Sequence, residues 1–475
     1  ATNAGTTGAP IFKAGSDKFA LTASTISGYT GTLKINNAAV APVKHAAEDA
    51  DPVAGVLAPS SFPAAISGTP SSTATGAAFT YSEVGTFVLA GYDPASNAGS
   101  PRGVFDGVAS ATECNDPTVS CENLKAATWT GVDSISAKGD CIADSYANVK
   151  DGNGKYGCNF GITQNTAFLG RFIPYRFALS GSLRNRADMA ACGDSGFTYF
   201  GEQINAIFTL TAQAADATTT KNYAGVLAKL DPTDFARLKV AAVDRTTTPP
   251  APAPQPPYLL TPRISTLGMP AGSCGTSCFA AGVAANITAS FMFARAAPEG
   301  AYAKVDVGID PADDDGVTVL FDIDTSSATN APLTPDRGKI GRTELRYGRL
   351  RIDNAYGSEL LRLPVSLEAQ YWNGNAYVRN VDDDCTPLAG AKFSLSKHTG
   401  GSGGITTANM NIANVVGGDP LSNGAGKIAL NAPTPAITRK GSVELRSEIP
   451  YLPGAGRETF GVYKAGPVIY VREIY

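Results

Sequence analysis

Short stretches of alternating apolar and polar residues recur along the chain and predict β-strands rather than helices. In LPVSLEAQY, residues 363–371, every second residue is apolar, which is typical of an antiparallel strand with one buried face. The Asn373-Gly374 pair that follows is a strong hairpin signal and returns the chain into AYVRN. The last stretch, residues 460–475, predicts another strand pair. We find no repeat of fixed period and no sustained helical amphipathicity.

Composition supports the same fold class. The 475 residues include 51 glycines and 31 prolines, and only 17% are charged, against about 25% in an average protein. Glycine and proline are turn residues, whereas helices depend on the charged and straight-chain residues that are scarce here. The sequence therefore predicts an all-β fold of antiparallel, immunoglobulin-like β-sandwich domains with long disulfide-pinned loops.

Two regions are expected. Residues 1–165 predict an immunoglobulin-like β domain with cysteine-rich loops in its second half. Residues 166–475 predict a second β region, which divides into two subdomains near 246–260 or near 330–340. The first of these stretches holds six prolines and indicates a stiff connector or an exposed loop.

Charge and hydropathy exclude several classes of protein. The net charge is −4 with scattered basic residues, so nucleic acid is a poor partner. The uncharged stretches 52–82 and 264–294 are interrupted by Pro, Gly and polar residues, so we expect no membrane span. The first residues lack the features of a signal peptide, and we expect an export signal to have been removed. Two histidines in the whole chain make most hydrolytic chemistry improbable.

Eight cysteines in an even number with short gaps indicate disulfides and an oxidising compartment. No CxxC zinc knuckle is present. The spacing favours neighbouring pairs and leaves one long-range bridge, although sequence alone does not settle connectivity. The expected pairs are Cys114–Cys121, Cys141–Cys158, Cys274–Cys278 and, over a long range, Cys192–Cys385.

Acidic residues cluster in two turns. Asp310, Asp313, Asp314 and Asp315 lie in DPADDDG, and a second cluster spans 382–384. Carboxylates in turns are ligands that calcium prefers in extracellular β proteins. Neither cluster has the EF-hand spacing, and solvated turns explain the acids equally well. Calcium is the one cofactor left open.

The motif Gly193-Asp194-Ser195-Gly196 surrounds the nucleophile in chymotrypsin-like proteases. A nucleophilic serine needs a base within hydrogen-bond reach, and only His45 and His398 exist in the chain. Neither histidine has the sequence context of that family. We interpret the motif as a turn and expect no catalytic residues.

Several long motifs occur in order along the second region: GRFIPYRFALSG, FTYFGE, GRLRIDNAYGSELLRLPVSLEAQYWNG, VDDDCT and GVYKAGPVIYVREIY. Together they resemble the C-terminal region of MshQ-like proteins, which are encoded with the mannose-sensitive haemagglutinin type IV pilus of Gram-negative bacteria. The resemblance spans about residues 165–475. It implies a secreted, pilus-associated surface protein and transfers no catalytic residue.

The expected function is that of an extracellular, non-enzymatic adhesin or filament or tip component, which acts through sheet edges and loops. Expected partners are pilin or other pilus subunits, a second copy of the chain, or a glycan on a host or other surface. Residues 1–10 are a candidate donor strand for such an assembly. The alternatives are a secreted surface hydrolase acting on glycans or protein, and a passive structural stalk.

Overall fold

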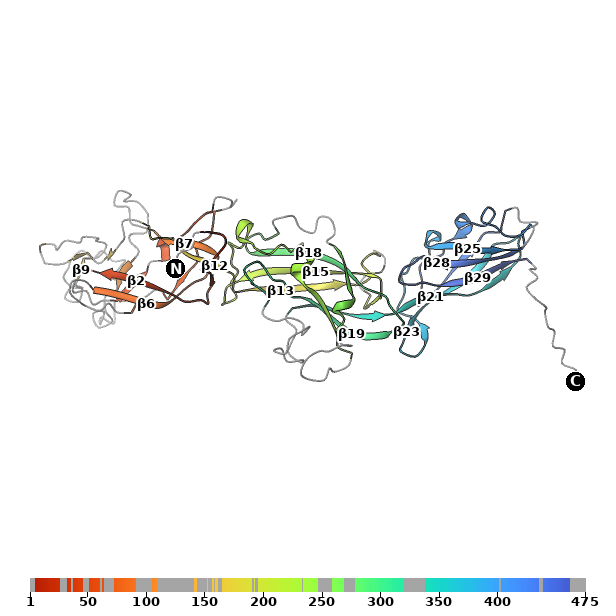
Figure 1. Ribbon diagram of the computed structural model, residues 1–475, viewed down its shortest axis with the longest axis horizontal. Coiled ribbons are helices and arrows are strands. Elements are labelled where there is room, and N and C mark those ends of the chain that lie inside the picture. Colours follow the sequence, from red (N-terminus) through yellow and green to blue (C-terminus); the bar gives the residue numbers. More distant parts are fainter. Residues whose placement is uncertain are drawn as a thin grey trace, which may run out of the picture.

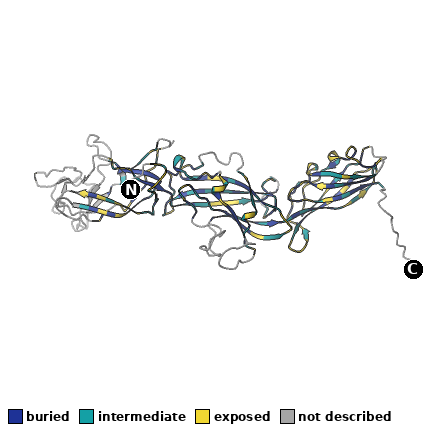
Figure 2. Ribbon diagram, viewed as in Figure 1, coloured by how far each residue is buried: buried dark blue, intermediate teal, exposed yellow. Residues whose placement is uncertain are grey.

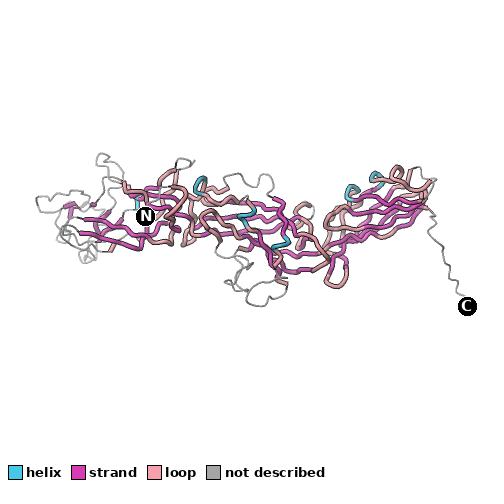
Figure 3. Tube along the Cα trace, viewed as in Figure 1, coloured by secondary structure: helices cyan, strands magenta, loops and turns pink. Residues whose placement is uncertain are grey.

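The computed structural model consists of three β-sandwich lobes that follow one another along the long axis (Figure 1). Strands and loops make up nearly all of the described chain, with a few single-turn helices (Figure 3). The predicted all-β class of antiparallel sandwiches is therefore confirmed. We define the first lobe as residues 5–173, the second as 174–347 and the third as 348–461. The structure describes residues 5–25, 32–35, 37–45, 51–59, 62–63, 72–90, 105–108, 141–142, 152, 156–157, 159–160, 165–189, 192, 195–232, 234–246, 259–268, 278–319, 338–400, 403–434 and 439–461.

The first lobe has an aromatic core between the sheets β1-β12-β7-β4 and β2-β6-β5. Tyr81 stacks on Phe87 with ring centroids 4.4 Å apart, and Phe172 packs against both rings. Because β6 and β7 belong to different sheets, residues 82–84 between them form a corner rather than a hairpin. The elements are β1 (Phe12–Lys13), β2 (Phe19–Thr25), β3 (Thr32–Ile35), η1 (Asn37–Ala39), β4 (Val40–Pro42), β5 (Leu57–Ala58), β6 (Ser72–Tyr81), β7 (Gly85–Leu89), β8 (Phe105–Val108), β9 (Cys141–Ile142), β10 (Tyr156–Gly157), β11 (Asn159–Phe160) and β12 (Leu169–Ile173).

The second lobe packs sheet β13-β15-β18-β17 against sheet β14-β20-β19-β16. Along β15 every second residue is buried, including Ile204, Phe208 and Leu210, so one face of the strand lines the core. The elements are β13 (Arg176–Arg184), β14 (Phe197–Tyr199), β15 (Gln203–Gln213), η3 (Gly225–Leu227), α3 (Phe235–Leu238), β16 (Val240–Asp244), η4 (Thr261–Arg263), β17 (Ile264–Gly268), β18 (Val283–Phe293), β19 (Gly300–Ile309) and β20 (Lys339–Arg346).

The two described ends of the proline-rich stretch 246–260 both belong to the second lobe, whereas residues 247–258 lie outside the described residues. The chain leaves β16 and returns beside it, because Leu259 bridges Val243 and the Leu260 amide donates to the Ala242 carbonyl at 2.9 Å. The passage into the third lobe comes instead at Tyr347, after the alternative stretch 330–340.

The third lobe packs sheet β21-β23-β27-β26 against sheet β22-β29-β28-β25. The predicted strand and hairpin are present: β23 has alternating burial and pairs with β24 across a turn in which Asn373 Oδ1 accepts the amide of Ala376 at 2.9 Å. The elements are β21 (Gly348–Ile352), β22 (Ala355–Gly357), β23 (Leu363–Trp372), β24 (Tyr377–Arg379), η5 (Gly390–Lys392), β25 (Phe393–Thr399), η6 (Ile412–Asn414), β26 (Val415–Val416), β27 (Ala425–Leu430), β28 (Gly441–Ser447) and β29 (Ala455–Phe460).

A carboxyl group is buried in the third lobe, whose strands carry buried, intermediate and exposed residues (Figure 2). Glu458 lies on β29 opposite Val443 and has no solvent exposure. Its Oε2 accepts the amide of Ala355 at 3.0 Å, whereas its Oε1 has no hydrogen-bond partner. Burial raises the pKa of Glu458 from 4.5 to about 8. The folded protein therefore holds a proton on this side chain at neutral pH.

We expect Glu458 to make the third lobe less stable as pH rises from about 5 to about 8. In this range the folded state keeps a proton that the unfolded state has released, so the free energy of unfolding falls, by at most about 1.4 kcal/mol per pH unit. Glu458→Gln should make this slope shallower, leaving the part that the raised pKa of Glu202 contributes, and the exposed Glu448→Gln should retain the full slope. Urea unfolding at a series of pH values measures both, and equal slopes in the two variants would contradict the assignment.

Candidate functional site

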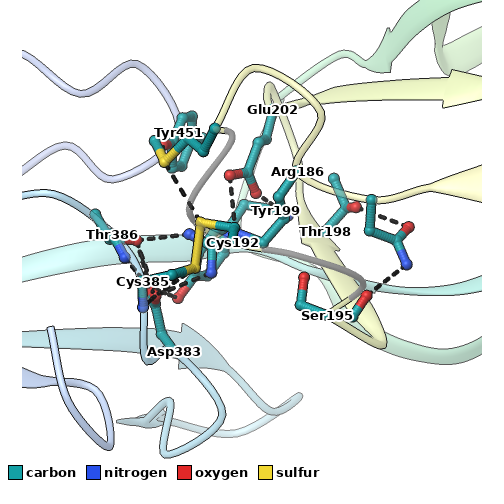
Figure 4. Close-up of polar contacts among 12 residues, drawn as sticks. Arg186, Cys192, Ser195, Thr198, Tyr199, Glu202, Asp383, Cys385, Thr386 and Tyr451 are labelled. Atoms are coloured by element: carbon teal, nitrogen blue, oxygen red, sulfur yellow. Dashed lines mark hydrogen bonds and ion pairs between the residues drawn. A yellow bond between two sulfur atoms is a disulfide. The ribbon is translucent and has the colours of Figure 1, made fainter. Parts of the chain in front are cut away.

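A long connection between β13 and β15, residues 185–202, projects from the second lobe into the third (Figure 4). Its strand β14 pairs in parallel with the end of β20. The side chains of Phe197 and Tyr199 are buried in the core of the third lobe, together with Leu350 and Tyr451. The second lobe thus supplies part of its neighbour's core, and the interface is a joint rather than a linker.

A fully buried arginine lies at the centre of this joint. Arg186 donates from Nε to Glu202 Oε1 at 2.9 Å, within the same projection. It donates from Nη1 to Asp383 Oδ1 at 2.9 Å and from Nη2 to Thr386 Oγ1 at 2.6 Å, both in the third lobe. Its guanidinium also lies 5.0 Å from the centre of the Phe197 ring. One cation therefore bridges two lobes with each of its three nitrogens engaged.

Asp383 also accepts hydrogen bonds from Tyr199 and Thr386. Its Oδ2 accepts the hydroxyl of Tyr199 at 2.9 Å and that of Thr386 at 2.7 Å, and its Oδ1 accepts the Thr386 amide at 3.1 Å. The Tyr199 ring stacks on Tyr451 at 5.7 Å, so the hydroxyl is held in place. A buried carboxylate with this many donors is satisfied only in one relative position of the two lobes.

Burial and neighbouring charges shift the pKa values of the ionisable side chains at the joint. Burial would lower the pKa of Arg186, but Glu202 and Asp383 raise it above its ordinary value, so the guanidinium stays charged. Burial raises the pKa of Glu202 to about 7, and Arg186 opposes this rise. Burial, followed by the charge of Asp383, raises the pKa of Tyr199, which keeps its proton and remains a donor. Arg186 and Tyr199 thus keep their protons at neutral pH, and both donate to Asp383.

A disulfide between Cys192 and Cys385 closes the joint covalently, and it is the long-range pair that the cysteine spacing favours. The bond lies beside the Arg186 network, since Cys385 is two residues from Asp383 (Figure 4). Cys278 is also disulfide-bonded, and its expected partner Cys274 lies outside the described residues. Cys114, Cys121 and Cys158 also lie outside the described residues. Cys141 is the first residue of β9.

Two further arginines flank the joint. Arg295 of the second lobe donates to the carbonyls of Tyr451 at 2.7 Å and Gly348 at 2.9 Å, and its guanidinium lies 4.1 Å from the centre of the Tyr347 ring. Arg346, at the end of β20, pairs with Asp382 at 2.6 Å. These contacts surround the passage between the lobes and fix the backbone there.

The first and second lobes meet through a different set of contacts. Glu83, at the corner between β6 and β7, accepts the backbone amides of Lys221 at 2.9 Å and Asn222 at 3.2 Å. Asn222 in turn exchanges two hydrogen bonds with the backbone of Val53. Val84, next to Glu83, is buried in the core of the second lobe.

Arg171 adds a bidentate ion pair to this first joint. Its Nη1 and Nη2 lie 2.6 and 2.7 Å from the two oxygens of Asp315, and its side chain also donates to the carbonyls of Thr6 and Gly8. The stretch expected as a donor strand, residues 1–10, is therefore held within its own chain from residue 5 onward. This finding argues against its use as a donor to another subunit.

The four acids proposed for calcium are each engaged by the protein. Asp310 and Asp314 lie near Lys239 and Arg237, at 3.6 and 2.6 Å. Asp313 accepts the Tyr223 hydroxyl at 2.8 Å, and Asp315 pairs with Arg171, as described above. Within the described ranges, no group of three or more acids, cysteines or histidines is arranged to hold a metal ion. Calcium binding stays a prediction without structural support.

The serine of the GDSG motif has a structural role. The Ser195 hydroxyl donates to the Phe197 carbonyl at 3.1 Å, and the Ser195 carbonyl accepts from Asn185 at 2.7 Å. His398 lies on β25 of the third lobe, where its Nε2 is 2.8 Å from the Met410 carbonyl, and His45 follows β4 of the first lobe. Ser195 is thus engaged by residues of its own connection, and the two histidines belong to the first and third lobes.

Sequence reasoning did not identify Arg186 and Tyr199 as partners of Asp383, or Glu202 as a partner of Arg186. The signal that could have found them is the Cys192–Cys385 pairing, because Arg186 lies six residues before one cysteine and Asp383 two residues before the other. A cross-link that brings these segments together also brings their opposite charges together.

Removing the central cation should destabilise the joint strongly. Arg186→Ala leaves Asp383 and Glu202 buried without their partner, which costs about 3–5 kcal/mol of unfolding free energy. The matched control is Arg351→Ala, because Arg351 pairs with Asp353 at 2.8 Å on the surface and should lose less than about 1 kcal/mol. Chemical unfolding measures both variants, and small-angle scattering should show bending only in the first. Equal losses would contradict a special role for Arg186.

Two family models match the chain on either side of this joint. DUF6701, third domain, matches residues 149–337, and DUF6701, fourth domain, matches residues 346–474. No curated protein matches the sequence. Among the described residues, no helix is long and apolar enough to cross a membrane.

Two solved structures show distant similarity. FdeC, a broadly conserved Escherichia coli adhesin, is 12% identical over 60% of this chain, with a TM-score of 0.19, and the chain spans 62% of its length. The D0-D1 domain of intimin is 9% identical over 60% of this chain and 97% of its own, with a TM-score of 0.15. At these TM-scores the similarity carries no conclusion about function. The family models show that the chain contains the third and fourth domains of DUF6701, and the Arg186 network and the Cys192–Cys385 disulfide join the two.

Proposed function

We propose that the chain is an extracellular, non-enzymatic surface protein that bears mechanical load, as the rigid shaft of a pilus-associated adhesin or tip component. The observation that carries this proposal is the second joint, which combines a fully buried ion network with a disulfide. A flexible tether needs neither feature. A shaft that must hold its end domains at a fixed distance needs both.

The disulfide determines how tension passes through the chain. It joins positions 193 residues apart, and the enclosed segment contains most of the second lobe and the start of the third. When the two ends are pulled, force reaches Cys192 and crosses directly to Cys385. The strands β14 to β24 therefore lie off the covalent load path and cannot be drawn out while the bond is intact.

The proposed location follows from the same bond and from the sequence resemblance. Disulfides persist in oxidising compartments, which supports an extracellular or cell-surface protein. The resemblance to MshQ-like proteins supports a Gram-negative cell and a type IV pilus. On this proposal the partners are pilin or other pilus subunits at one end of the shaft and a surface or host glycan at the other. The engagement of Ser195 within its own turn supports a non-enzymatic role over a hydrolase.

Single-molecule pulling tests the load path. The oxidised chain should unfold without releasing the segment enclosed by the disulfide. Cys192→Ser with Cys385→Ser should release 193 further residues, about 65 nm of contour at about 3.4 Å per residue. A double variant is preferable to a reductant because it leaves other disulfides intact. Equal total extensions would show that the bond carries no load.

Pilus association is tested by shearing pili from cells that express a tagged chain. We expect the chain in the sheared fraction of piliated cells, and a strong loss from that fraction when the major pilin is deleted. An Arg186→Ala strain should retain the chain on pili but attach less firmly under flow, because its shaft bends. Recovery of the chain in equal amounts with and without pilin would refute the pilus assignment.

A further inference from the structure

Three large apolar side chains are exposed close together on the third lobe. Tyr356, Leu360 and Leu361 are 76%, 58% and 66% exposed, and they lie on β22 and on the short connection from β22 to β23. We call these three residues the apolar cluster. Scattered exposed apolar residues are ordinary, but three within six positions indicate a surface that something covers.

The cluster lies at the edge of a sheet. In the order β22-β29-β28-β25, β22 is the terminal strand and pairs in parallel with β29 alone among the described strands. An edge strand leaves backbone amides and carbonyls available for another strand. The apolar cluster therefore adjoins a backbone that can accept one.

A segment suited to this edge follows directly in the sequence. Residues 462–475 read VYKAGPVIYVREIY, and the part after Pro467 is rich in β-branched and aromatic residues. The segment departs beside the cluster, since the Gly461 amide donates to the Gly357 carbonyl at 2.8 Å. The fourth-domain family model extends to residue 474, so cluster and segment belong to one domain unit.

We propose that residues 468–475 bind along β22 of the same chain as an additional antiparallel strand and cover the apolar cluster. The strands β22 and β29 both run toward the point of departure, and the Gly466-Pro467 turn signal provides the reversal that an antiparallel return requires. Eight residues in a strand span about 26 Å, enough to cover β22 and its adjoining connection.

The same chain is favoured over a second copy by the length of the connection. Only six residues, 462–467, separate the departure point from the proposed strand. Such a short tether keeps the strand at a high effective concentration near its own edge. Exchange between two copies would occur at the same end of each chain and would close as a symmetric dimer. The test distinguishes this outcome.

Photo-crosslinking on the full chain tests the proposal. Benzoylphenylalanine placed at position 356 should crosslink to residues 468–475, with a yield several-fold above the same probe at Leu267, which is 47% exposed on the second lobe. An equal mixture of unlabelled and nitrogen-15-labelled chains should give crosslinked peptides of one isotope only. Mixed-isotope peptides would overturn the proposal in favour of strand exchange, and the absence of crosslinks to 468–475 would overturn it altogether.

Deletion of residues 468–475 provides a second readout. It should uncover the apolar cluster and raise the fluorescence of an anilinonaphthalene sulfonate dye several-fold. Combining the deletion with Tyr356→Ser, Leu360→Ser and Leu361→Ser should return the fluorescence to that of the full chain. A deletion that leaves dye binding unchanged would contradict the proposal.

Discussion

The relative position of the second and third lobes depends on the burial of one positive charge. A guanidinium taken out of water is costly unless carboxylates meet it at hydrogen-bonding distance. Arg186 comes from the second lobe and Asp383 from the third, so the charge is compensated only when the lobes are docked. Bending the joint would leave both ions in an apolar core. The network therefore contributes less to net stability than to the choice of a single arrangement.

At each joint, one lobe contributes side chains to the hydrophobic core of the next lobe. Val84 belongs to the corner of the first lobe, and its side chain is buried in the core of the second lobe. Phe197 and Tyr199 belong to the second lobe, and their side chains are buried in the core of the third lobe. The three hydrophobic cores are separate, but their boundaries interlock. Because Val84 lies at the corner between β6 and β7, and Phe197 and Tyr199 lie on the short strand β14 between β13 and β15, the sandwiches are joined in series without long linkers.

Local patterns in the sequence predict local structure well, and they predict the joints poorly. The strand and hairpin of residues 363–379 follow from alternation and from an Asn-Gly turn, and both are present. The acids of residues 310–315 suggested a metal site because their partners are remote in sequence. Arg171 lies 144 residues from Asp315, and no spacing rule connects them.

The local sequence pattern likewise does not predict which polar residues are buried. Among the three consecutive acids 382–384, only Asp383 is fully buried, whereas its neighbours face the surface. The Cys192–Cys385 pair is the one long-range contact that the cysteine spacing predicts, because pairing the neighbouring cysteines leaves these two. The opposite charges of Arg186 and Asp383, close in sequence to the two cysteines, mark the same joint.

The Cys192–Cys385 bond has a further consequence for a protein exposed to proteases. A single cleavage anywhere between residues 193 and 384 opens the polypeptide but leaves both products attached, since each retains one of the two sulfurs. The first lobe thus stays covalently bound to the third when the backbone is cut between the two cysteines. Covalent separation of the products by a single cleavage therefore requires a cut before Cys192 or after Cys385, so the disulfide protects the continuity of most of the second lobe and the start of the third.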